Sequence, residues 1–77
     1  MTRFYRPNLK RARLDKGMTQ QMMADALGIT LRHYQKIEYA EINGSFEVWD
    51  GAEDILGIHQ RILRVVEENH PVRAESR

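Results

Sequence analysis

Hydrophobic and polar residues follow a helical spacing through residues 19–38, and this pattern predicts two short helices. Met23, Ala24 and Leu27 lie at positions i, i+1 and i+4, which places them on one face of a first helix. Tyr34 and Ile37, three residues apart, form the buried face of a second helix.

The residues between these helices predict a tight turn. Gly28 directly follows Leu27, where a helix end favours a residue that tolerates a left-handed backbone. Ile29 is the apolar residue of the turn, and Thr19 and Thr30 are N-cap candidates for the two helices. Two helices joined by a short turn that contains glycine make a helix-turn-helix.

The same periodicity predicts a helix before this motif, over residues 7–16. Pro7 suits the first turn of a helix, and Gly17 ends it. Leu9 and Ala12 face inward, and the pattern does not decide whether Leu14 also faces inward.

The lead-in before this helix is basic and aromatic, and its roles differ by residue. Phe4 and Tyr5 are expected to cover one edge of the core. Arg3 and Arg6 are consistent either with packing or with an arm along a DNA backbone, and the sequence does not decide between these roles.

Two further helices are expected after the motif. Ser45, which follows the turn signal of residues 43–44, is the N-cap candidate for a helix that ends at Gly57. The inward-facing residues of this helix are predicted to be Phe46, Val48, Trp49, Ala52, Ile55 and Leu56. Gly51 costs about 1 kcal/mol inside a helix, so a bent or short helix is expected.

A last helix is predicted from residue 58 or 59 to residue 69, before Pro71 and a frayed tail over residues 71–77. Its apolar stripe is predicted to be Ile58, Ile62, Val65 and Val66. No strand is predicted. The expected fold is therefore an all-α, compact five-helix domain over residues 1–70.

The helix of residues 31–38 has a polar outer face. Arg32, Gln35 and Lys36 lie roughly 100–200° around the helix from Tyr34. Together with Leu31 and His33, they offer donors for base edges and phosphates and an apolar group for a thymine methyl. The alternative is an ordinary solvated helix face.

Charge is divided unevenly along the chain, although the net charge is only +1. Residues 1–36 carry eight Lys/Arg and two Asp, a net +6, whereas residues 37–77 carry four Lys/Arg and nine acidic residues, a net −5. The first half is therefore expected to face a polyanion, and the second half is expected to face away from it.

Composition argues against several classes of protein. The chain has no cysteine, so disulfides and thiolate metal sites are excluded. No apolar run approaches the roughly 18 residues of a membrane span, and no signal-peptide core follows the start, so a cytoplasmic protein is expected. The histidines are scattered (His33, His59 and His70), and no catalytic arrangement or phosphate loop is present, which predicts a non-enzyme without cofactor or metal.

Five segments together resemble the phage repressor and Cro-type helix-turn-helix proteins, the xenobiotic-response-element family. They are L-K-R-A-R at 9–13, G-M-T-Q at 17–20, M-A-D-A-L-G-I-T at 23–30, Y-Q-K-I-E at 34–38 and I-L-G-I at 55–58. The resemblance covers about two thirds of the chain and implies a lambda-repressor-like fold that binds DNA through residues 31–38.

The resemblance also implies residue roles. Gln20 matches a glutamine that contacts phosphate and braces the recognition helix, and Arg13 and Glu38 match a structural ion pair. The set expected to bind DNA is Thr19, Gln20, Thr30, Leu31, Arg32, His33, Gln35, Lys36 and Asn43. The chain departs from the family at Leu31 (often Gln, Ser or Arg), Ala40 (Gly) and Gly44 (Pro).

The function predicted from these features is a sequence-specific, double-stranded DNA-binding transcriptional regulator. It is expected to act as a repressor-like homodimer associated with the bacterial or phage nucleoid. The alternative is a protein-interaction module, such as an antitoxin, that holds a partner through the acidic second half of the chain.

Overall fold

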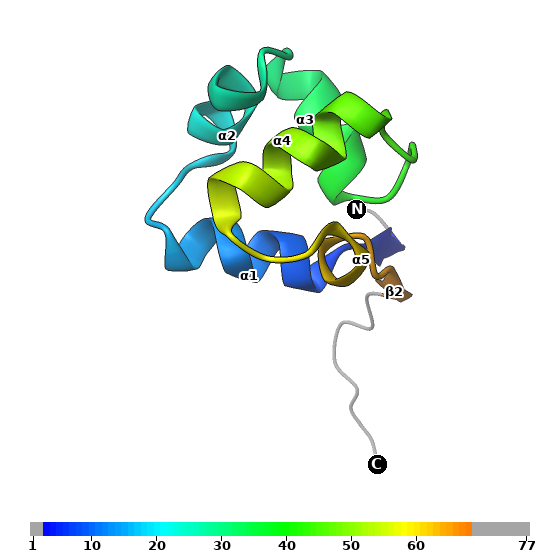
Figure 1. The fold of residues 1–77 in the computed structure, drawn as a ribbon. Coiled ribbons are helices and arrows are strands. Elements are labelled where there is room, and N and C mark those ends of the chain that lie inside the picture. Colours follow the sequence, from blue (N-terminus) through cyan, green and yellow to red (C-terminus); the bar gives the residue numbers. More distant parts are fainter. Residues whose placement is uncertain (1–2, 69–77) are drawn as a thin grey trace.

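The computed structural model describes residues 3–68, which form five helices and one small sheet (Figure 1). In chain order the elements are β1 (Phe4–Tyr5), α1 (Pro7–Asp15), α2 (Gln20–Leu27), α3 (Leu31–Glu38), α4 (Phe46–Leu56), α5 (Gln60–Leu63) and β2 (Glu67–Glu68). In the view of Figure 1, α4 lies between α2 and α3 above it and α1 and α5 below it. The predicted all-α fold is confirmed.

The helix-turn-helix forms as its local signals predict. The Thr19 hydroxyl accepts a hydrogen bond from the Met22 N–H, and the Thr30 hydroxyl accepts one from the His33 N–H, each at 3.0 Å. Gly28 ends α2 with a φ of 74°. Each cap satisfies a backbone group that the first turn or last turn of a helix leaves without a partner.

The core draws side chains from all five helices. Its buried residues are Leu9, Ala12, Met23, Ala24, Tyr34, Ile37, Val48, Trp49, Ala52, Leu56 and Leu63. Because α4 packs against both α2 and α5, and α1 packs against both α3 and α5, the two motif helices rest on a closed scaffold.

The α4 helix differs from expectation at two positions. Phe46 is 82% exposed, so its predicted place in the core is wrong, and the buried face of α4 begins at Val48. Gly51 does not shorten the helix, which runs for 11 residues. A Cβ at residue 51 would lie 2.9 Å from Cδ2 of Leu27, so the glycine lets α2 approach α4 closely.

The predicted last helix is wrong over most of its length. The helix α5 has four residues, and the chain then pairs as β2 with β1, antiparallel, with Tyr5 opposite Glu67. Two side chains near the start of α1 help to end α5. Arg6 Nε donates to the Arg64 carbonyl, and Asn8 Nδ2 donates to the Ile62 carbonyl.

The predicted apolar stripe is also wrong. Leu63 is the buried residue of this segment, whereas Ile62, Val65 and Val66 are each more than 40% exposed. Ile58 packs against the edge of the core, as predicted. The expected helical residue 69 and the tail of residues 71–77 lie outside the described residues.

The start of the described chain corrects the expectations for the strand and for Phe4, and it decides the roles of Leu14 and Arg6, which the sequence left open. The prediction that the chain has no strand is wrong, since Phe4 and Tyr5 form β1. Phe4 and Leu14 are 46% and 55% exposed, so neither is a core residue. Arg6, in contrast, is buried, so this side chain packs within the fold and does not extend from it as an arm.

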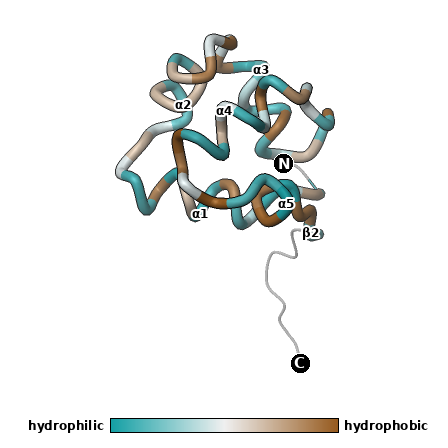
Figure 2. The backbone as a smooth tube through the Cα atoms, viewed as in Figure 1, coloured by the Kyte–Doolittle hydropathy of each residue, from teal (hydrophilic) through white to brown (hydrophobic). Residues whose placement is uncertain are grey.

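Hydrophobic and hydrophilic residues are mixed within each helix rather than gathered into one long apolar element (Figure 2). Among residues 3–68, no helix has the length and apolar character that crossing a membrane requires.

Candidate nucleic-acid interface

The outer side of α3 carries the two cationic side chains of this helix. Arg32 is exposed and Lys36 is half-buried, while the opposite side of the helix buries Tyr34 and Ile37. Neither Arg32 nor Lys36 forms an ion pair within the described part of the chain. The helix therefore presents two positive charges to solvent that no ion pair of residues 3–68 neutralises.

Shallow depressions lie along this side of α3, and Arg32 and Lys36 line both of them. One, of about 270 Å³, adds Thr30, His33 and Ile42. The other, of about 150 Å³, adds Gln35, Tyr39 and Glu41. The structure thus groups five of the predicted DNA-binding residues around α3: Thr30, Arg32, His33, Gln35 and Lys36. Leu31, half-buried, begins the same helix.

Gln20, at the start of α2, is bonded to α3 through its side chain. Its Nε2 donates to Glu38 Oε2 at 2.9 Å and to the Tyr39 hydroxyl at 3.3 Å, and its Oε1 accepts from Gln35 Nε2 at 3.1 Å. Since these bonds occupy both ends of the amide, the side chain fixes the position of α3 relative to α2.

Arg13 and Glu38 lie together in the interior, where they join α1 to α3. Arg13 Nε and Nη2 donate to the two carboxylate oxygens of Glu38 at 2.9 and 3.1 Å, and Tyr34 donates to Oε1 at 2.7 Å. Burial lowers the pKa of Arg13, but the hydrogen bond and charge of Glu38 outweigh it, so the net shift is upward. A two-pronged pair of this kind is strong as well as geometrically specific.

The loop after α3 explains two departures from the family pattern. Ala40 has a φ of 59°, the left-handed position where the family has glycine, so α3 ends at Glu38. Gly44 has a φ of 81°, which proline at this position could not adopt. Asn43 is exposed, and its carbonyl accepts from Trp49 Nε1 at 2.7 Å, which ties the loop to α4.

Arg6 is a structural residue whose role no local pattern indicates. It is only 4% exposed, and its guanidinium donates to the carbonyls of Ile37, Ile42 and Arg64. The guanidinium also lies 5.1 Å from the centre of the Trp49 ring. Because all these partners are distant in sequence, the neighbours of residue 6 do not reveal them.

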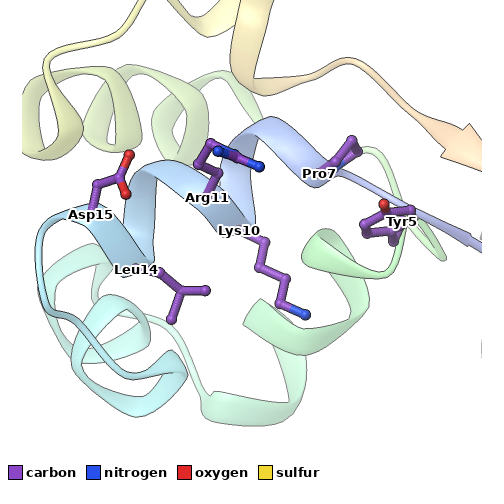
Figure 3. A pocket seen from close by; sticks show the side chains of 6 residues that line it. All are labelled: Tyr5, Pro7, Lys10, Arg11, Leu14 and Asp15. Atoms are coloured by element: carbon purple, nitrogen blue, oxygen red, sulfur yellow. The ribbon is translucent and has the colours of Figure 1, made fainter.

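A separate pocket lies along α1 (Figure 3). Its lining residues are Tyr5, Pro7, Lys10, Arg11, Leu14 and Asp15, which belong to α1 and the strand before it. The residues predicted to bind DNA lie on α2, α3 and the loop after α3, so this pocket is not part of the candidate interface.

No group of three or more His, Cys, Asp or Glu residues able to hold a metal ion occurs within residues 3–68.

Comparisons with known proteins agree with this arrangement. A family model described as helix-turn-helix matches residues 9–59, which include α2, α3 and α4. The SPbeta prophage-derived uncharacterized HTH-type transcriptional regulator YonR of Bacillus subtilis (strain 168) is 40% identical over 55 residues, 71% of this chain and 51% of that protein. The chain thus spans about half the length of this relative. No solved structure matches the chain.

The family match covers most of the described chain, and it includes the caps, the turn and the exposed cationic side of α3. The chain belongs to the Cro/C1-type helix-turn-helix family of DNA-binding transcriptional regulators.

Proposed function

We propose that this protein binds double-stranded DNA sequence-specifically, as a homodimeric repressor-like regulator that places α3 in the major groove. The observation that carries the proposal is the exposed Arg32 and neighbouring Lys36 on a helix whose other side is anchored in the core. A helix presented in this way fits the major groove of B-form DNA, which admits an α-helix.

The residues of α3 have distinct roles in this proposal. Arg32 donates two hydrogen bonds to guanine, and Lys36 donates to guanine or to a phosphate. Leu31 and His33 contact a thymine methyl or a sugar edge. Gln35 and Gln20 hold each other and the helix in place through their 3.1 Å hydrogen bond.

Contacts to the DNA backbone are proposed at three further places on the protein. The first turn of α2, after Thr19, has free N–H groups that favour a phosphate. Thr30 and Asn43, both exposed, lie at the start of α3 and in the loop after it. These contacts position the protein without reading sequence.

Selection of binding sites from a random duplex pool tests the proposal. We expect a near-palindromic site with half-sites about 10 base pairs apart, since a dimer places two recognition helices one turn of DNA apart. Recovery of no enriched sequence, together with binding that is insensitive to salt, would contradict sequence-specific binding.

Substituting Arg32→Ala tests the reading of bases directly. We expect a loss of about 1–3 kcal/mol on the selected duplex and a relaxed preference at one base pair. Fluorescence anisotropy on the selected duplex and on a random duplex measures both effects. Arg11→Ala on α1 removes the same charge from another exposed position and serves as the control. An equal loss on both duplexes would assign Arg32 to the DNA backbone instead.

A further inference from the structure

Arg6, Arg61 and Arg64 lie close together outside the helix-turn-helix. Arg6, Asn43, Arg61, Arg64 and Val66 line an open pocket of about 480 Å³ beside the loop after α3. No carboxylate belongs to this lining. Arg61 and Arg64 are moreover the only Lys or Arg residues between positions 37 and 68 of the sequence, so the acidic half of the described chain gathers its positive charge here.

Arg6 contributes a buried positive charge with a free edge. Its Nε and Nη1 donate to three backbone carbonyls, whereas its Nη2 has no hydrogen-bond partner among the described residues. Burial, followed by the positive charge of Arg64, lowers the pKa of the Arg6 guanidinium. A buried polar group without a partner is costly, and an anion in the pocket would satisfy it.

Arg61 and Arg64 are exposed, and their side chains have no acidic partner within residues 3–68. Glu47 lines a neighbouring pocket with Arg64, but no ion pair joins the two side chains. The two ion pairs of the described chain, Arg3–Glu68 and Arg13–Glu38, involve none of the pocket arginines. The positive charge of the pocket is therefore not neutralised by an ion pair within residues 3–68.

We propose that Arg6, Arg61 and Arg64, with the Asn43 amide, form a binding pocket for a phosphate-type oxyanion. Guanidinium groups match the oxygens of phosphate in both charge and hydrogen-bond geometry. Two sources supply this chemistry: a backbone phosphate of a bound duplex and a free phosphorylated small molecule.

The position of the pocket favours the backbone phosphate. Asn43 is adjacent in sequence to Ile42, which lines the depression beside Arg32 and Lys36 on α3. The pocket therefore continues the surface proposed to face DNA, and this assignment of the source rests on the proposed function. If the pocket holds a backbone phosphate, Arg61 of α5 and Arg64 after it contact the DNA. The net negative charge of the second half of the chain predicts instead that this half faces away from DNA.

The double variant R61Q/R64Q tests the pocket. Both side chains are exposed and form no hydrogen bond within the described residues, so the fold is expected to persist, and circular dichroism checks it. The control K10Q/R11Q removes the same charge from exposed positions on α1.

The first measurement is the salt dependence of duplex binding by fluorescence anisotropy. If the pocket holds a backbone phosphate, R61Q/R64Q weakens binding equally on selected and random duplexes and reduces the slope of log K against log salt by about 1. The control keeps the wild-type slope.

The second measurement is a nuclear magnetic resonance titration of the free protein with inorganic phosphate, against chloride at matched ionic strength. If the pocket accepts a free oxyanion, the Arg6 Nε–H signal shifts and saturates in the wild type and the control, and this response is lost in R61Q/R64Q.

The two measurements separate the outcomes. A response in the first alone assigns the site to a DNA phosphate, and a response in the second alone assigns it to a small ligand. No difference between R61Q/R64Q and K10Q/R11Q in either measurement overturns the pocket. If the wild type binds no duplex, the proposed function fails, and the phosphate titration by itself decides the pocket.

Discussion

Glu38 connects three helices through one buried carboxylate. It is 1% exposed and accepts hydrogen bonds from Arg13 on α1, Gln20 on α2 and Tyr34 on α3. A buried charge is tolerated only when it is paired and hydrogen-bonded. The orientation of α3 therefore depends on a polar residue of the interior as well as on apolar packing.

Tyr34 makes the stability of the fold sensitive to alkaline pH. Burial, then the hydrogen bond to Glu38 and its charge, raises the pKa of Tyr34 far above its ordinary value of 10.0. Below about pH 10 the phenol is neutral in both the folded and the unfolded chain. Above this pH only the unfolded chain ionises there, so the stabilisation that Tyr34 provides is lost as pH rises.

Denaturant unfolding of the wild type and Tyr34→Phe between pH 8 and 11 checks this prediction. We expect Tyr34→Phe to be less stable at pH 8 by about 1–2 kcal/mol, because Glu38 loses a donor. We also expect its free energy of unfolding to fall less steeply above about pH 10. Equal slopes in the two proteins would contradict the shifted pKa.

Ala40 is the one residue other than glycine with a positive φ among residues 3–68. A left-handed conformation costs an alanine roughly 1–2 kcal/mol, and glycine avoids this cost at the expense of a more flexible unfolded chain. We therefore expect Ala40→Gly to stabilise the protein by about 0.5–1 kcal/mol in thermal or denaturant unfolding. Ala26→Gly, at an exposed site inside α2, is the matched control and should destabilise it. Destabilisation by Ala40→Gly would show that the left-handed position is unstrained.

At the scale of the elements, the contact between α2 and α4 depends on the absence of a side chain at Gly51. A Cβ there would meet Leu27 Cδ2 at 2.9 Å. Alanine gains about 1 kcal/mol of helix propensity over glycine, whereas overpacking costs about 1–3 kcal/mol. Because Leu27 Cδ2 is the end of a half-buried side chain that can rotate, only part of this cost applies, and we expect Gly51→Ala to be close to neutral in the wild type.

A double-mutant cycle with Leu27→Ala, followed by denaturant unfolding, tests whether the Leu27 side chain causes the effect of Gly51→Ala on stability. In the Leu27→Ala background the clash is absent, so Gly51→Ala is expected to be stabilising by about 1 kcal/mol. The same change in both backgrounds would mean that the close approach of α2 and α4 does not constrain residue 51.

At the scale of the whole molecule, one DNA-binding module of this size calls for a second copy to reach useful specificity. Several apolar side chains are exposed in the described chain, and Phe46 is the most exposed of them at 82%. We propose that a second copy covers Phe46, since aromatic side chains are enriched at protein interfaces relative to the rest of the surface.

We expect Phe46→Ser to weaken self-association in sedimentation equilibrium at about tens of micromolar and to reduce affinity for a two-half-site duplex by about 10²-fold. Affinity for a single half-site should not change. Leu14→Ser, at another exposed apolar position, is the control. A wild type that stays monomeric with and without DNA would refute the dimer.

Which side of α3 faces solvent could be predicted largely from the sequence. Tyr34 and Ile37 set which side of α3 is buried, and the helical repeat then places Arg32 on the opposite side. The hydrogen bond between Gln20 and Gln35 could not be derived from periodicity, because it depends on how two helices meet.

The sequence by itself determined the local elements. Thr19, Thr30 and Ser45 begin their helices as predicted, because each cap is a hydrogen bond between residues three positions apart. Such short-range contacts require no knowledge of the remaining chain.

Only the tertiary structure decided how the two ends of the described chain are used. The pairing of β1 with β2 joins residues about 60 positions apart. The hydrogen bond from the buried Arg6 to the Arg64 carbonyl, just after the short α5, does the same. The apolar pattern of residues 58–66 is compatible with a longer helix, and the hydrogen bonds from Arg6 and Asn8 favour the shorter one. Partners this distant leave no periodic signal, so the surface that Arg6, Arg61 and Arg64 form emerges only on folding.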